Sequence, residues 1–153
     1  MDSHRIAWLA GLYDGDGCFA MDNSYQQSLG HKRLLPKVHL ITTCRKTHQR
    51  VMEILHELSV GVHVVHRENP QPSKVGKYNS WAPRWDIVVA GMKRVRTLLP
   101  HVLPHLVTKY EEAKLLREFI ESRMSGSLRG PYTEREHEIH VAVGALKTKR
   151  HLS

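Results

Sequence analysis

The chain has 153 residues, of which 25% are charged and 41% hydrophobic. This length suits one compact domain, so we treat residues 1–153 as a single unit. Lysine and arginine exceed aspartate and glutamate by 23 − 15 = 8, which excludes an acidic disordered chain. The N-terminal apolar stretch Ile6–Tyr13 is far shorter than the roughly 20 residues of a membrane span, so we expect no membrane association. Two cysteines, Cys18 and Cys44, are too few for a disulfide framework and are expected to be free thiols.

The positive charge is concentrated in three windows that contain no acidic residue. Neither aspartate nor glutamate occurs in residues 23–52, 69–85 or 87–110, whereas lysine and arginine occur in all three. A solvated basic surface would explain any single window. Three of them within one domain favour a polyanionic partner, of which nucleic acid is the most common.

The first predicted element is a helix over Ser3–Gly15, because apolar residues recur at helical spacing. Further helices are expected over Thr47–Leu58, from Gly91 to Leu99 with a break at Pro100, and over Thr108–Met124. The pattern Thr133-Glu134-Arg135-Glu136 is a capping box that begins a C-terminal helix, with a basic tail, within residues 132–153.

Alternating apolar and polar residues predict four strands, which come in consecutive pairs. They cover Cys18–Ser24, Leu35–Cys44, Val60–His66 and Tyr78–Ala90, the last interrupted by Pro83. Paired strands favour an antiparallel sheet of the α+β class, with helices on one face. The other face is expected to be open and polar, and a two-stranded ribbon fits the major groove of DNA.

The segment Leu9-Ala10-Gly11-Leu12-Tyr13-Asp14-Gly15-Asp16-Gly17 contains the residues most indicative of function. Gly11 and Gly15 are four residues apart, so they lie on one face of the helix and would allow another helix to approach closely. Asp14 and Asp16 lie at the negative end of the helix dipole, where a divalent cation would stabilise them. The alternative for a bare Asp-Gly-Asp-Gly sequence is a solvated helix end.

This segment resembles the motif of the LAGLIDADG homing endonucleases and differs from it only at Tyr13 and Gly15. The predicted order of elements over about residues 3–124 is similar to the family's αββαββα core. The resemblance implies an antiparallel sheet that forms a saddle over DNA. It also implies a site-specific endonuclease, usually intron-encoded, that makes a double-strand break in a long pseudo-palindromic site and leaves 3′ overhangs.

The resemblance also implies roles for individual residues. Asp16 would bind the catalytic metal together with the backbone carbonyl of Gly15, and Asp14 would have a minor, structural role. Lys109, Arg45 and Gln49 match further positions around the metal, although the arginine and the glutamine are exchanged relative to the family pattern. The expected metal is Mg²⁺ or Mn²⁺, with Ca²⁺ binding without supporting cleavage, and no organic cofactor is expected.

Single-motif members of this family are homodimers, which implies an interface at Leu9, Ala10, Gly11 and Gly15. Exposed strand positions and the basic C-terminus supply the candidate contacts to double-stranded DNA: Ser24, Gln26, Lys32, Arg33, Lys37, His39, Thr43, His66, Arg67, Lys77, Asn79, Arg84, Asp86, Lys147 and Lys149. The alternatives are an RNA maturase of the same fold and a DNA-binding protein that does not cleave. Retention of Asp16 favours the enzyme, since a protein that only binds nucleic acid has no need of an acid facing phosphate.

Overall fold

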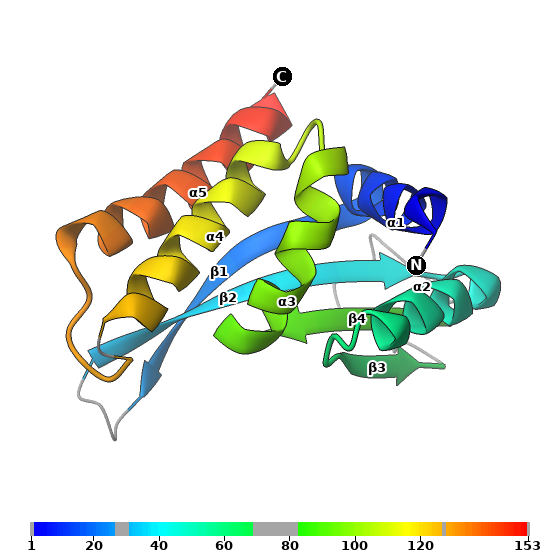
Figure 1. The fold of residues 1–153 in the computed structure, drawn as a ribbon, viewed down its shortest axis with the longest axis horizontal. Helices are drawn as coiled ribbons and strands as arrows, with labels where there is room; N and C mark the ends of the chain where they lie inside the picture. The colour runs from blue at the N-terminus through cyan, green and yellow to red at the C-terminus, as the bar shows by residue number, and fades with distance from the viewer. Residues whose placement is uncertain (1, 27–30, 69–82, 127, 153) are drawn as a thin grey trace, which may run out of the picture.

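The computed structural model describes residues 2–26, 31–68, 83–126 and 128–152. Figure 1 shows the elements in chain order, which are α1 Ser3–Asp16, β1 Gly17–Gln26, β2 His31–Thr42, α2 Arg45–Glu57, β3 His63–Arg67, β4 Arg84–Ala90, α3 Met92–Val102, the 3₁₀ turn η1 Leu103–His105, α4 Tyr110–Ser125 and α5 Glu134–Leu152. The predicted α+β order of helix, two strands, helix, two strands and further helices is therefore confirmed.

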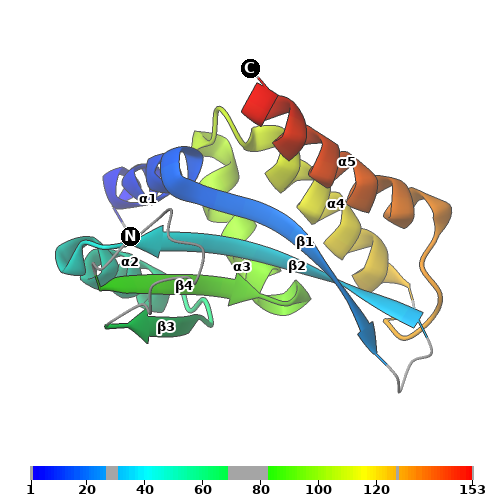
Figure 2. The ribbon, with the colours of Figure 1, turned by 180° about the vertical axis from the view of Figure 1, so that it is seen from behind.

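The four strands form one antiparallel sheet in the order β1-β2-β4-β3. The helices pack on one face of this sheet, and Figure 2, seen from behind, shows the opposite face without a covering helix. We call this second surface the open face. The predicted one-sided arrangement is thus confirmed.

Strand alternation separates core residues from open-face residues. Val38 and Leu40 of β2 are fully or almost fully buried beneath the helices, as are Ile87 and Val89 of β4. The residues between them point the other way, because successive side chains of a strand lie on opposite faces. Burial of each such aliphatic side chain contributes about 1.5–3 kcal/mol, and this apolar layer holds the helices on the sheet.

Several sequence-based boundaries were wrong. β2 covers His31–Thr42 rather than Leu35–Cys44, and β3 begins at His63 rather than at Val60. α3 continues through Pro100 to Val102 rather than ending before the proline. Pro100 lies in the last turn and is exposed, so its missing N–H removes only one late helical bond. The basic C-terminus is not a separate tail, because α5 continues to Leu152.

The capping box that begins α5 is confirmed. The backbone N–H of Thr133 donates to Glu136 Oε1 at 2.8 Å, and the N–H of Glu136 donates to Thr133 Oγ1 at 3.1 Å. Both cysteines are free, as expected. In the part of the chain that the structure describes, no helix is long and apolar enough to cross a lipid bilayer.

Candidate active site

The C-terminal end of α1 is joined to the start of α4 through the carboxylate of Asp14. Oδ2 accepts the backbone N–H groups of Val107 and Thr108 at 2.8 and 3.2 Å, and Oδ1 accepts that of Lys109 at 2.9 Å. These three consecutive N–H groups precede α4, where they have no helical acceptor. Asp14 therefore has the structural role expected from the motif, and it determines where Lys109 lies.

Lys109 extends back toward α1 and is only 8% exposed. Its Nζ donates to the carbonyl of Tyr13 at 3.1 Å and to the carbonyl of Gly17. An ammonium group is favourable at this negative end of the helix dipole. Burial lowers the pKa of Lys109, and the neighbouring Arg150 lowers it further. The structure thus brings the predicted lysine against the predicted motif.

Asp16 is the last residue of α1, and its side chain is exposed to solvent. The chain then turns sharply at Gly17, where a Cβ atom would come within 2.8 Å of the backbone of Tyr13. Only glycine fits this close approach, so Gly17 allows β1 to leave the helix directly. The turn places the Asp16 carboxylate at the end of the motif helix, where the sheet begins.

A pocket of about 470 Å³ opens beside this turn and brings α1, β1, α4 and α5 together. Its lining residues are Asp14, Gly15, Gly17, Cys18, Phe19, Thr108, Lys109, Glu112, Lys147 and Arg150. Glu112, which no sequence pattern predicted as a site residue, is 2% exposed and forms an ion pair with Arg150. The two lie 38 residues apart in the chain, so no local pattern could reveal this pairing. The pair fixes the end of α5 against α4 and brings Lys147 into the pocket, whereas Lys149 is exposed.

Arg45 and Gln49 lie on the first turns of α2 and are exposed. The N-terminus of α2 and the C-terminus of α1 lie at the same end of the sheet, because Gly17 pairs with Leu40 just before α2 begins. Among the described residues, no hydrogen bond or ion pair joins either side chain to Asp16 or Lys109. Arg45 lines a different pocket, of about 540 Å³, with His66, Glu68, Pro83 and Trp85. The catalytic roles of Arg45 and Gln49 stay predictions.

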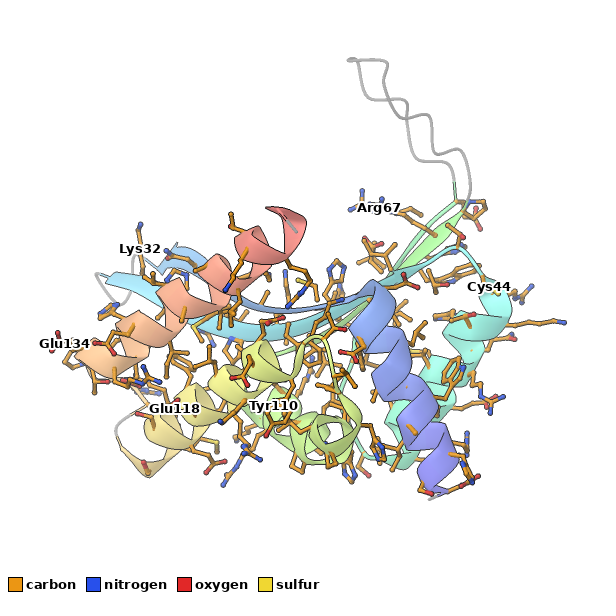
Figure 3. All side chains as sticks on the ribbon, turned by 90° about the horizontal axis from the view of Figure 1, so that it is seen from above. Lys32, Cys44, Arg67, Tyr110, Glu118 and Glu134 are labelled. Atoms are coloured by element: carbon orange, nitrogen blue, oxygen red, sulfur yellow. The ribbon has the colours of Figure 1, made fainter. Side chains whose placement is uncertain are left out.

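Charged residues of β3 and β4 form a cluster on the open face. Asp86 pairs with Arg84 at 3.4 Å and with Arg67 at 3.6 Å. On the neighbouring strands Lys37 pairs with Asp22 at 2.8 Å. Figure 3 labels Arg67 at one end of the sheet and Lys32 at the other, so the candidate contacts extend over its full length.

Other candidate DNA contacts have different positions. Ser24 and Arg33 are exposed and directly opposite each other, whereas Lys32 alternates with Arg33 and points to the other side of the strand. Thr43 is exposed between β2 and α2. The side chain of Gln26 and the whole of Lys77 and Asn79 lie outside the described residues.

His66 is exposed, as expected, but it lies on the helix-covered side of the sheet and not on the open face. Its ring stacks on Trp85, with centroids 4.7 Å apart, and His48 of α2 stacks on the same tryptophan at 5.2 Å. These contacts place His66 on the helix-covered face. His39, by contrast, lies on the open face, and burial together with Lys37 lowers its pKa.

For two residues, the assignment to the dimer interface was wrong. Leu9 and Ala10 are fully buried in the core of the same chain, so they cannot contact a second copy. Gly11 and Gly15 are exposed, and a Cβ at either would meet no atom within 4 Å. The exposed face of α1 is therefore the glycine face.

A divalent metal would find oxygen ligands at the end of α1. In the described ranges, no group of three or more histidine, cysteine, aspartate and glutamate residues could hold a metal ion. The chain instead offers the exposed Asp16 carboxylate next to the last carbonyl groups of the helix. Hard oxygen donors of this kind fit Mg²⁺, which keeps several waters and shares its shell with phosphate oxygens.

The fold is similar to several solved homing endonuclease structures. One is I-CvuI in complex with its target, with 24% identity, 94% of this chain and 82% of that chain covered, and a TM-score of 0.69. The archaeal intron-encoded I-Vdi141I complexed with DNA has 13% identity, coverage of 97% and 99%, and a TM-score of 0.60. The LAGLIDADG homing endonuclease I-SmaMI bound to cleaved DNA has 12% identity, coverage of 91% and 42%, and a TM-score of 0.63.

These likenesses show that the chain has the fold of the LAGLIDADG homing endonucleases. The resemblance found in Leu9–Gly17 is confirmed at the level of the fold, since the motif forms α1 and the turn into β1. No family model matches the chain, and no curated protein matches it.

Proposed function

We propose that this chain is a site-specific endonuclease that cuts double-stranded DNA. The observation that carries the proposal is the exposed Asp16 carboxylate, which directly precedes Gly17, the residue whose carbonyl accepts from Lys109 Nζ and at which β1 begins. The similar proteins I-CvuI, I-Vdi141I and I-SmaMI were solved with DNA, which supports the same partner here. The DNA would lie along the open face, where the exposed Arg33 could contact guanine or phosphate. There Arg67 and Arg84 would exchange Asp86 for DNA groups.

The working enzyme is a homodimer in this proposal. Cutting both strands requires two active sites, and each chain has one motif. The chain covers 42% of I-SmaMI but 82% of I-CvuI and 99% of I-Vdi141I, so it corresponds to about half of the longer protein. The glycine face of α1 would allow two such helices to pack closely. A twofold dimer fits a pseudo-palindromic site, with cuts that leave short 3′ overhangs.

Asp16 and the carbonyl of Gly15 would hold Mg²⁺ or Mn²⁺ in each chain. The similar I-CvuI was studied in the presence of Ca and of Mg. When bound, the ion stabilises negative charge on phosphate oxygens and supplies an activated water. Lys109 Nζ donates hydrogen bonds to two carbonyls at the end of α1, which holds its positive charge near the turn at Gly17. There the charge would stabilise the attacked phosphate. Arg45 and Gln49 would add polar contacts from α2, and an intron is the expected coding context.

The second candidate is an RNA maturase or a non-cleaving DNA-binding protein of the same fold. The position of Asp16 favours cleavage. An exposed carboxylate directed toward a polyanion weakens simple binding by charge repulsion, and it becomes useful when a cation lies between the two.

The test compares Asp16→Asn with Asp2→Asn, which makes the same chemical change at the other end of α1. Asp2 caps the helix by accepting the N–H of His4, and asparagine preserves that cap. In Mg²⁺, we expect Asp16→Asn to keep specific binding to a selected duplex but to cut it at least about a hundredfold more slowly. Asp2→Asn should cut at the wild-type rate. Undiminished cutting by Asp16→Asn would exclude Asp16 as the metal ligand.

A further inference from the structure

β1 and β2 extend beyond the rest of the sheet as a two-stranded ribbon. β1 pairs with β2 from Gly17–Leu40 to Gln26–His31, whereas β4 pairs with β2 only over Lys37–Thr42. Within the described chain, residues 31–36 of β2 therefore have a strand neighbour on one side only, and Figure 2 shows the ribbon continuing past β4. Such an edge leaves backbone N–H and C=O groups without ladder partners.

Two contacts from distant segments occupy this edge. The backbone N–H of Gly91 donates to the carbonyl of Pro36 at 3.0 Å, where the chain leaves β4. Further along the ribbon, the N–H of Leu34 donates to the hydroxyl oxygen of Tyr132 at 2.9 Å. Tyr132 belongs to the α4–α5 connection, 98 residues away. Its hydroxyl therefore accepts a backbone N–H that a longer β4 would otherwise pair with.

The position of Tyr132 is fixed by buried groups of α4. The guanidinium carbon of Arg123 lies 4.5 Å from the Tyr132 ring centroid, and the ring of Phe119 lies 6.0 Å away. Arg123 is 5% exposed and pairs with Glu136, which is 1% exposed. The same guanidinium donates to the carbonyls of Leu128, Gly130 and Pro131. These contacts hold residues 128–132 against α4, and the hydroxyl of Tyr132 joins them to the ribbon.

The ribbon carries open-face residues far from the candidate active site. The seven residue-to-residue steps from Gly17 to Ser24 span about 24 Å at about 3.4 Å each, or about seven base-pair steps of duplex DNA. Ser24 and Arg33 face each other at that distance. A small change in the angle of the ribbon would displace them from base edges without moving Asp16.

We propose that Tyr132 is a positioning residue for sequence discrimination, an inference that rests on the proposed function. By holding the free edge of β2, it sets the angle of the ribbon to the active site and so aligns Ser24 and Arg33 with the outer base pairs of the target. The tyrosine acts from the helix-covered side, through the backbone of Leu34 rather than by touching DNA.

The test uses Tyr132→Phe, which removes the hydroxyl and keeps the ring. The control for loss of stability alone is Ile120→Val, which removes one methylene group from a buried side chain of α4. Wild type first selects its duplex from a randomised library, and each variant is then assayed on single mismatches along that duplex. Mismatches normally weaken binding by about tenfold. For Tyr132→Phe we expect the penalty at outer base pairs to fall to about threefold or less, with inner penalties unchanged.

Further measurements complete the test. Amide exchange at Leu34 should become faster in Tyr132→Phe. Adding Arg33→Ala to Tyr132→Phe should lower the mismatch penalty at the outer base pairs little further. A wild-type mismatch profile for Tyr132→Phe would overturn the positioning role while leaving the endonuclease intact. An equal loss of discrimination in Ile120→Val would overturn it as well. If wild type selects no sequence from the library, the proposed function fails, and this inference fails with it.

Discussion

The carboxylate of Asp14 joins two elements that are distant in sequence. It accepts hydrogen bonds from the three consecutive backbone N–H groups of residues 107–109. In the other direction, Lys109 Nζ donates to the carbonyls of Tyr13 and Gly17 at the end of α1. Hydrogen bonds to a charged acceptor are about twice as strong as neutral ones. These bonds hold in place the turn to which the exposed Asp16, the proposed metal ligand, belongs.

Removing this acceptor should affect both stability and catalysis. We expect Asp14→Ala to lower the free energy of unfolding by about 2–4 kcal/mol, because three N–H groups lose a charged partner. Cleavage should slow as Lys109 loses its anchor. Urea denaturation and single-turnover cutting measure the two effects. Asp22→Ala, which breaks only the surface pair with Lys37, is the control and should cost less than about 1 kcal/mol.

His39 should make the stability of the fold depend on pH. Burial, followed by Lys37 and Arg84, lowers its pKa, while Asp86 and Asp22 act in the opposite direction. Because the folded-state pKa lies below the unfolded value of about 6.5, the unfolded chain takes up the proton first as pH falls. Stability should be fully present above about pH 6.5 and decline below it.

The substitution His39→Gln isolates this contribution from that of His48, whose pKa burial also lowers. Urea midpoints measured at about pH 7.5 and about pH 5.5 should differ less in His39→Gln than in wild type. Equal pH dependence in the two proteins would contradict the assignment.

At the scale of elements, α1 shows which sequence signals were informative. The helical spacing of Leu9 and Ala10 with Ile6 and Tyr13 already indicated the core face, and both residues are fully buried. The family resemblance alone assigned them to the dimer interface. Periodicity was correct here because burial follows the geometry of the helix, whereas a motif does not show which of its residues face inward.

Other elements were predictable for similar reasons. Alternation identified the core residues of β2, and the capping box located the start of α5, since both depend on neighbours in sequence. The contact of Tyr132 with Leu34, the pairing of Glu112 with Arg150 and the stacking of His66 on Trp85 were not predictable. Each depends on how distant elements pack, for which a single sequence contains no local signal.

At the scale of the whole molecule, the proposed double-strand cleavage requires two chains. A Cβ atom added at Gly11 would meet no described atom of its own chain within 4 Å, and leucine is a better helix former by close to 1 kcal/mol. We therefore expect Gly11→Leu to keep its thermal stability as a monomer but to lose the dimer. Gly144→Leu on α5, where a Cβ also meets nothing within 4 Å, is the matched control.

Sedimentation equilibrium at micromolar concentration measures this effect. Wild type and Gly144→Leu should be dimers, and Gly11→Leu should be a monomer that no longer makes double-strand breaks. A Gly11→Leu protein with the wild-type dimer affinity would contradict packing through the glycine face of α1.

The most direct test of the central claim is cleavage of a randomised duplex library in Mg²⁺, with sequencing of both strands at every cut end. We expect paired cuts at one pseudo-palindromic sequence that leave short 3′ overhangs, and we expect these cuts to be absent with Asp16→Asn. Cuts without sequence preference, or cuts that persist in Asp16→Asn, would contradict the claim that this fold and this carboxylate form a site-specific DNA endonuclease.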